Sequence, residues 1–151
     1  MHQLSHTARP ALIRLVRRCI VVAFIGLAAC STIGPFSQVA YQQATAIKAE
    51  AMTIMSNAAD DYGVHATEVK ALRLDVEKAY EYARGRPKNE VSTKQWEIIR
   101  DPNGHSLGGF LKRWEGQKTL NQAFVDEAKK VVADDLDQVI GLESGKDKGS
   151  T

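Results

Sequence analysis

The stretch AYQQATAIKAEAMTIMSNA, residues 40–58, decides the fold class of this chain. Its small and aliphatic residues recur at spacings of four, three, four, three and four, in the order Ala40, Ala44, Ile47, Ala51, Ile54 and Ala58. This spacing places them on one face of an α-helix that packs against other helices. Because alanine lets a neighbouring helix approach closely, one interpretation of this stripe is self-association of two copies of the chain.

A second helical stripe follows along the chain. Its members are His65, Val69, Leu72, Val76, Ala79 or Tyr80, and Ala83. Gly85-Arg86-Pro87 then ends the helix. The register of the two stripes slips around Gly63, which we expect to lie just beyond the first helix. We therefore predict a helical hairpin over residues 38–84, with one long helix as the alternative.

The rest of the chain is also helical in its spacing. Residues 92–95 (STKQ) have the spacing of a capping box and predict the start of a short helix with Trp96, Ile98 and Ile99, while residues 101–104 (DPNG) predict a turn. Two further apolar faces follow, one with Leu107, Phe110, Leu111 and Trp114, and one with Leu120, Phe124, Ala128, Val131 or Val132, Leu136, and Val139 or Ile140. No window has the alternation of a strand. We predict an all-α fold, a small helical bundle built on the hairpin over residues 38–143, and a disordered tail over residues 144–151.

The first thirty residues have a different character. Residues 1–18 hold four arginines and no acidic residue, and residues 20–29 carry no charge. This order is typical of an export signal, and the apolar run is shorter than the roughly 20 residues that span a bilayer. The run closes on Leu27-Ala28-Ala29-Cys30, which resembles the lipobox of a bacterial lipoprotein signal peptide.

The resemblance implies cleavage between Ala29 and Cys30, a diacylglycerol on the Cys30 sulfur, and a further acyl chain such as palmitate on the new amino terminus. Residues 1–29 are then a lipoprotein signal peptide, and residues 30–37 are the lipidated cysteine and a short tether. More than one acyl chain anchors a protein stably, so we expect the domain to be held on a membrane outside the cytoplasm. In a Gram-negative cell it would face the periplasm, and Ser31, where enteric lipoproteins of the inner membrane carry aspartate, favours the outer membrane.

The route of export stays open between two pathways. Arg17-Arg18 faintly resembles the arginine pair of a twin-arginine signal. Val16, however, takes the place of the polar residue that usually precedes that pair. We therefore favour the general secretory route.

The charge of the chain depends on whether the signal is counted. The full chain has 20 basic and 18 acidic residues, and four of the basic residues lie in residues 1–29. The mature domain then has 16 basic and 18 acidic residues, a net charge of −2. The basic character of the full chain therefore belongs to the signal and gives no support to nucleic-acid binding.

Candidate catalytic and metal sites are weak. Asp61, His65 and Glu68 would share a helix face and could bind a divalent metal, but we expect Gly63 to break that helix and leave a solvated turn. The mature chain has no nucleophile elbow, and only His65 and His105 could serve as catalytic bases. We therefore expect no catalytic residue, no metal ion and no cofactor.

The aromatic residues between positions 96 and 124 suggest two alternatives. In the first, Trp96, Phe110, Trp114 and Phe124 form the core where two short helices cap the hairpin. In the second, an exposed tryptophan anchors a partner, since tryptophan is enriched in binding hot spots. The candidate partner-binding residues are then Trp96, Arg100, Phe110, Arg113 and Trp114.

The leading functional hypothesis is a lipid-anchored, non-enzymatic interaction or assembly module of the cell envelope. Its expected partners are the membrane, through the acyl chains on Cys30, and an envelope protein or a second copy of the chain. The alternative is an envelope enzyme or a small-ligand-binding protein. Its site would use Trp96, Glu97, Asp101 and His105.

Overall fold

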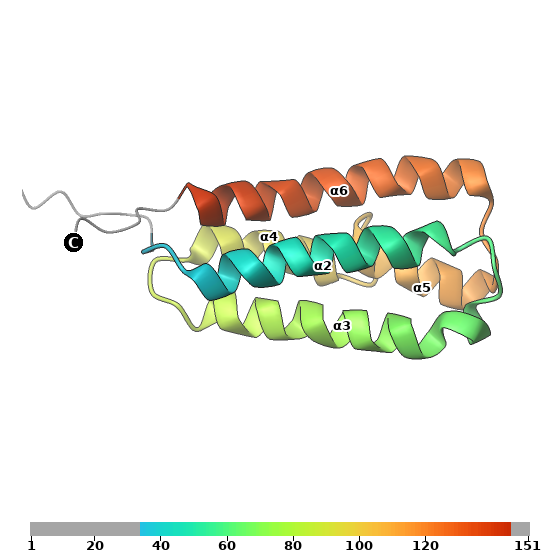
Figure 1. Ribbon diagram of the computed structural model, residues 1–151, viewed down its shortest axis with the longest axis horizontal. Coiled ribbons are helices and arrows are strands. Elements are labelled where there is room, and N and C mark those ends of the chain that lie inside the picture. Colours follow the sequence, from blue (N-terminus) through green and yellow to red (C-terminus); the bar gives the residue numbers. More distant parts are fainter. Residues whose placement is uncertain (1–33, 146–151) are drawn as a thin grey trace, which may run out of the picture. The chain divides into compact units, whose positions relative to one another are not determined.

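The described part of the chain is a helical bundle without strands, which confirms the all-α prediction. The computed structural model describes residues 34–145, so the predicted signal peptide, Cys30 and residues 146–151 of the predicted tail lie outside the described residues. In chain order, the helices are α2 (Gln38–Ser56), α3 (Tyr62–Arg84), α4 (Glu90–Arg100), α5 (Leu107–Gln117) and α6 (Gln122–Ser144). Figure 1 shows how they lie side by side.

The five helices form a bundle of four rods, because the short helices α4 and α5 lie one after the other and together form one rod. Helix α2 contacts α3 and α6, α4 contacts the same two helices, and α5 contacts α3 and α4. In Figure 1, α4 and α5 lie behind α2 and follow one another along the bundle. The turn over residues 101–106 separates them, so the fourth rod is interrupted near its middle.

The hairpin prediction is confirmed, and the alternative of one long helix is wrong. Helix α2 ends at Ser56, α3 begins at Tyr62, and the two helices pack against each other. The sequence predicts that Gly63 lies between the two helices and interrupts the helical structure, whereas it lies in the first turn of α3. Asp61 is the N-cap there, and its side chain accepts a hydrogen bond of 2.8 Å from the Gly63 amide. This cap satisfies an amide that has no partner within the helix.

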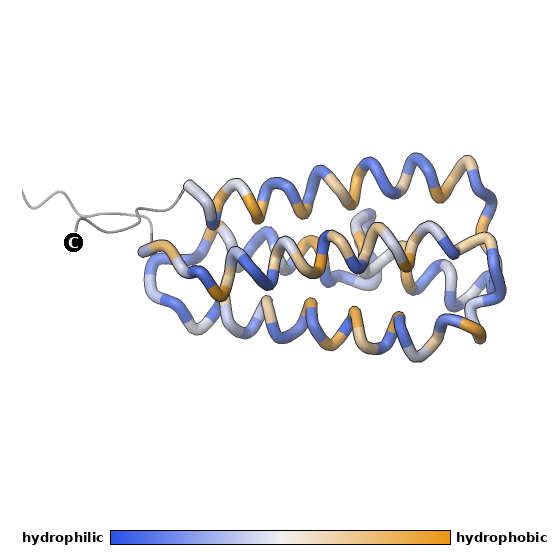
Figure 2. Tube along the Cα trace, in the orientation of Figure 1, coloured by the Kyte–Doolittle hydropathy of each residue, from blue (hydrophilic) through white to orange (hydrophobic). Residues whose placement is uncertain are grey.

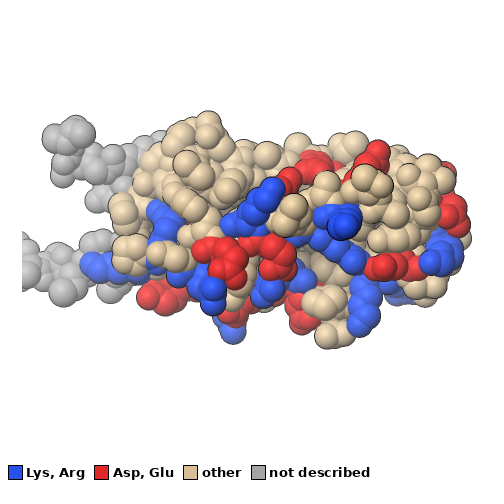
Figure 3. Space-filling model, turned by 90° about the horizontal axis from the view of Figure 1, so that it is seen from below, with Lys and Arg blue, Asp and Glu red and all other residues tan. Residues whose placement is uncertain are grey.

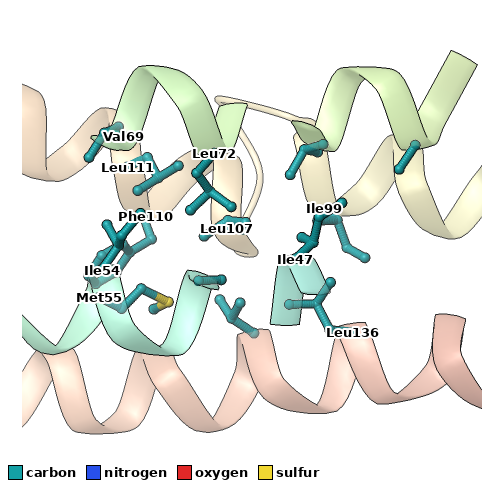
Figure 4. Packing of buried hydrophobic residues seen from close by; sticks show 14 of the residues in the cluster. Ile47, Ile54, Met55, Val69, Leu72, Ile99, Leu107, Phe110, Leu111 and Leu136 are labelled. Atoms are coloured by element: carbon teal, nitrogen blue, oxygen red, sulfur yellow. The ribbon is translucent and has the colours of Figure 1, made fainter. Parts of the chain in front are cut away.

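The stripe of residues 40–58 forms the inner face of α2 and continues to Ala58 in the turn that follows. All of its six predicted members are buried, and all except Ala40 pack in one core with the apolar residues of α3. Figure 2 shows hydrophobic positions of α3 on its side toward α2, and Figure 4 shows Ile54 and Met55 facing Val69, Phe110 and Leu111. Because helices of the same chain cover this stripe, it is not exposed to a second copy.

Helix α4 begins earlier than its capping box predicts. Its first residue is Glu90, whereas Ser92 is buried inside the helix and is not a cap. Asn89 occupies the N-cap position, but its side chain donates a hydrogen bond of 2.9 Å to the Ala83 carbonyl of α3. The start of α4 is therefore fixed by contact with the preceding helix.

Helix α6 begins two residues after the predicted Leu120, which lies buried in the connection before it. Asn121 caps the helix by accepting a hydrogen bond of 2.9 Å from the Ala123 amide. The inward face also differs slightly from the predicted one, since Phe124 is only partly buried and Val131 is exposed. The buried residues of α6 are Val125, Val132, Leu136, Val139 and Glu143.

The two ends of the bundle are built differently. We call residues 34–37 the leading segment, the end where they lie the leading end, and the opposite end the far end. At the far end, the Leu120 amide donates to the Ala58 carbonyl and the Tyr62 amide to the Lys118 carbonyl, each at 2.8 Å. These backbone bonds join the α2–α3 turn to the α5–α6 connection.

Candidate functional site

A hollow lies on the side of the bundle at the interruption between α4 and α5. Residues of α3 also line it. The hollow has a volume of about 710 Å³. Its floor is apolar, formed by Val76, Ile99, Leu107 and Leu111. Ile98 stands at its margin with 47% of its surface exposed.

Two adjacent glycines allow the chain to turn sharply beside this hollow. A Cβ atom on Gly108 would lie 2.4 Å from the Arg100 carbonyl oxygen, and one on Gly109 would lie 2.0 Å from the Gly104 carbonyl oxygen. Both distances are far shorter than van der Waals contact, so the start of α5 can approach the end of α4 only without side chains at these positions. The Gly-Gly pair thus has a packing function in the fourth rod.

Arg100, at the end of α4, is fixed at the hollow by contacts with Glu77 and Tyr80. Its Nε and Nη2 atoms donate to both carboxylate oxygens of Glu77, at 2.8 and 2.7 Å. Its guanidinium also lies 4.2 Å from the centre of the Tyr80 ring. The hydrogen bond to Glu77 raises the pKa of Arg100 above its ordinary value, so this side chain stays charged.

Most of the other charged side chains at the hollow are paired, whereas Asp101 accepts a hydrogen bond from the Asn103 amide. Arg73 contacts Glu115 at 3.0 Å, and Lys94 contacts Glu97 at 3.0 Å. The charged residues lining the hollow are Arg73, Lys94, Arg100, Glu77, Glu97 and Asp101, so the two signs balance. Figure 3, which views the bundle from the α3 side, shows acidic and basic groups interspersed. The hollow therefore has an apolar floor and a polar rim in which the charges balance.

Three of the predicted partner-binding residues are inside the protein. Trp96, Phe110 and Trp114 are 3%, 4% and 0% exposed, so the expectation of an exposed tryptophan is wrong. The core alternative is correct for these three residues, but Phe124 is only partly buried, and the two short helices form the fourth rod of the bundle and do not cap the hairpin. Trp114 donates a hydrogen bond of 3.1 Å from Nε1 to the Asp60 carbonyl, which satisfies its one polar atom. The two predicted arginines are at the surface, where Arg100 borders the hollow and Arg113 lies 4.1 Å from the centre of the Phe124 ring.

The structure does not bring together the four residues of the alternative site. Glu97 and Asp101 line the hollow, but Trp96 is buried in the core. His105 is exposed in the turn before α5 and is not part of the lining. Only the two carboxylates of that prediction share a site.

His65 lies in a different setting from the solvated turn that we expected. Its ring packs 5.6 Å from the Trp114 ring, and its side chain is 13% exposed. Nδ1 forms a hydrogen bond of 3.1 Å with Glu68, and Nε2 lies 3.5 Å from the Asp60 carboxylate. The hydrogen bond to Glu68 is the main cause that raises the pKa of His65, with Asp60 adding to it and burial opposing it.

This histidine cluster does not form a metal site. Asp61, the third predicted ligand, uses its side chain to cap α3. Within residues 34–145, no group of three or more His, Cys, Asp or Glu side chains is placed to bind a metal ion. Sequence spacing did not indicate Asp60, because it lies in the turn before α3 and meets His65 only through the folding of that turn.

None of the helices within residues 34–145 has the length and apolar character that a membrane span requires. Comparison of the chain with protein-family models, with curated proteins and with solved structures finds no match.

Proposed function

We propose that the protein is a lipid-anchored module of the bacterial cell envelope that binds a protein partner through the hollow between α3, α4 and α5. The anchor in this proposal is Cys30, acylated after cleavage of residues 1–29. Support for it comes from the lipobox at residues 27–30 and the charged and apolar segments before it. Ser31 favours the outer membrane as the site of attachment.

The observation that carries the binding proposal is the composition of the hollow. Protein-binding surfaces combine an apolar centre with a polar rim, and the floor around Leu107 and Leu111 lies inside the paired charges of Arg100 and Glu77. Ile98 is a large apolar side chain that is partly exposed to water, so its burial by a partner would contribute favourable hydrophobic free energy to binding. We therefore expect the partner to insert an apolar side chain beside Ile98.

The position of the hollow along the bundle suits a partner close to the membrane. From Gly85, where α3 ends at the leading end, to Arg73 the chain runs twelve helical residues, or about 18 Å. The hollow also opens on the side of the bundle, not at either end. A partner bound there would be held beside the bundle and within a short distance of the bilayer.

Site-specific crosslinking in cells tests this proposal. A photoreactive amino acid is placed at position 98 of the full-length chain and, as a matched control, at position 131. Ile98 and Val131 are both apolar helical residues, 47% and 48% exposed, but Val131 lies on α6 and does not line the hollow. We expect a discrete adduct with another envelope protein from position 98 and none from position 131.

Two further variants make the result decisive. Ile98→Glu should abolish the adduct formed from a neighbouring hollow position, such as 94, whereas Val131→Glu should leave it unchanged. Cys30→Ala should remove acyl labelling and greatly reduce the adduct. Equal crosslinking from positions 98 and 131 would contradict the hollow as the binding site, and acyl labelling that persists in Cys30→Ala would contradict the anchor.

A second candidate function is binding of a small molecule in the same hollow. Its volume of about 710 Å³ falls within the range of roughly 300 to 1,000 Å³ found for such sites, and Glu97 and Asp101 could orient a polar ligand. Native mass spectrometry of the protein purified from cells tests this candidate. A bound small molecule that is lost in Ile98→Glu and kept in Val131→Glu would favour it over a protein partner.

A further inference from the structure

The leading segment is packed on the bundle and does not hang from it. The Gly34 amide donates a hydrogen bond of 2.8 Å to the Lys88 carbonyl in the α3–α4 loop. The Pro35 carbonyl accepts a hydrogen bond from Nη2 of Arg86, and the Ser37 and Tyr82 hydroxyl groups share one of 2.9 Å. Three successive contacts therefore fix where the chain enters the bundle.

Arg86 ties this attachment to the rest of the bundle. Its Nη1 atom donates 2.9 Å to the Glu143 carboxylate at the end of α6, and Glu143 is only 1% exposed. The Arg86 guanidinium also lies 5.8 Å from the centre of the Tyr82 ring on α3. One side chain thus links the leading segment, α3 and α6.

This geometry limits how far the leading end can lie from an anchor on Cys30. Three residues lie between Cys30 and Gly34, and the four steps from one residue to the next cover at most about 3.6 Å each in a fully extended chain, or about 14 Å in total. The inference therefore rests on the proposed lipidation of Cys30. Given that anchor, the leading end is the part of the bundle that faces the bilayer.

The surface of the leading end is suited to such a position. It exposes Val39 at the start of α2, Tyr82 near the end of α3 and Val91 at the start of α4, which are 48%, 37% and 67% exposed. Tyrosine is favoured at membrane interfaces, because one side of the ring is apolar and the hydroxyl is polar. The exposed charges nearby balance, since Arg84 pairs with Glu81 and Lys88 is close to Glu90 in the chain.

We infer that the leading end rests on the lipid surface, with Val39, Tyr82 and Val91 in the headgroup region and the helices standing away from the bilayer. The far end then points into the aqueous compartment, and the hollow faces sideways. Because the charges of the leading end balance, apolar contact and the acyl anchor hold it there, and we expect the contact to depend little on salt.

Fluorescence quenching at two matched positions tests this orientation. Val91→Cys and Val64→Cys each place one thiol in the first turn of a helix, at the leading and far ends, where the native valines are 67% and 76% exposed. Under the proposed processing Cys19 is removed and Cys30 is acylated, so the new cysteine is the single free thiol. Each lipidated protein is labelled with a polarity-sensitive fluorophore and inserted into the outer leaflet of vesicles of phosphatidylethanolamine and phosphatidylglycerol.

We expect the label at position 91 to be quenched by aqueous iodide severalfold less than the label at position 64. Equal and efficient quenching at both positions would overturn the inference, because the leading end would then be in water. Protection of both labels would also overturn it, because the bundle would then lie flat on the membrane. Mass spectrometry of the same samples separates the two proposals, since a protein without acyl mass overturns the anchor itself.

Discussion

The far end and the leading end of the bundle close it by different means. At the far end, main-chain hydrogen bonds from Leu120 to Ala58 and from Tyr62 to Lys118 join the two connections, with Trp114 buried beneath them. At the leading end, one main-chain bond joins Gly34 to Lys88, and the other links come from the side chains of Arg86 and Asn89 and from the Tyr82 hydroxyl.

The two ends should therefore tolerate different substitutions. Main-chain bonds survive most side-chain changes, so the far end should be sensitive mainly at the aromatic residue that supports its turns. The leading end depends on a few polar side chains, one of them in an ion pair with a buried carboxylate. Loss of a single partner there should weaken several contacts together.

Trp114→Ala should have the largest effect. It removes a fully buried ring, its edge contact with Tyr62 and its hydrogen bond to Asp60, and should lower the free energy of unfolding by about 4 kcal/mol. Urea denaturation followed by circular dichroism measures this loss. Trp114→Phe should cost less, because it keeps an aromatic ring. A loss as small as that of Val131→Ala, at an exposed position, would contradict the assigned role of Trp114.

Arg86→Met should have the next largest effect, at the other end. Glu143 would lose its ion-pair partner while remaining buried, at a cost of about 3 kcal/mol in the free energy of unfolding. The double variant Arg86→Met/Glu143→Leu removes the buried charge as well and should recover much of the loss. If the double variant is no more stable than Arg86→Met alone, the ion pair is not what closes the leading end.

His65 should give the far end a smaller, pH-dependent contribution. Because its pKa is raised in the folded state, the stabilisation is fully present below the ordinary value of 6.5 and disappears as the pH rises through the raised value. Both carboxylate partners are largely exposed, so the effect should be about 0.5 to 1 kcal/mol.

Urea denaturation of the wild type and His65→Gln, from below pH 6.5 to above the raised pKa of His65, measures the effect. The difference in free energy of unfolding between the two proteins should change over the range and then level off at higher pH. A constant difference would show that the ring acts only by packing against Trp114.

Lys118→Gly and Lys88→Gly should have the smallest effects and act alike at both ends. These lysines have φ angles of 70° and 56°, a conformation that costs roughly 1–2 kcal/mol for a residue with a Cβ atom. Glycine removes that strain. It also loses more conformational freedom on folding, which costs about 0.5–1 kcal/mol, so a net stabilisation of about 0.5 kcal/mol is expected at each site. Thermal melting measures it, and a lower Tm at either position would contradict the strain argument.

The helical content and the hairpin could be predicted from the sequence because they depend on local periodicity. The stripe from Ala40 to Ala58 specifies both a helix and its buried face, and the structure buries every member of it. Helix starts were less predictable. Asn89 and Asn121 set the starts of α4 and α6 through contacts at the helix ends, whereas the prediction relied on the capping-box spacing at Ser92 and the stripe that begins at Leu120.

Most of the candidate site could not be predicted from the local sequence pattern. The hollow lies where the turn after α4 interrupts the fourth rod, and the sequence shows the Gly108-Gly109 pair beside it without showing what approaches these glycines. Arg100 was named from its position among aromatic residues, but its carboxylate partner Glu77 comes from another helix. Burial of Trp96 and Trp114 was likewise decided by how the helices meet.

The leading segment and the end of α6 lie at the same end of the bundle, and this has a mechanical consequence. Helices α2 and α6 run antiparallel, as the contacts of Lys48 with Asp137 and of Ser56 with Lys129 show. A force that pulls Gly34 and Gly145 apart would therefore load one pair of turns at a time and unzip the bundle from its base. A force between the leading end and a partner in the hollow would instead shear several turns together. The bundle should yield easily to tension between Gly34 and Gly145 and resist tension between the proposed anchor and a partner bound in the hollow.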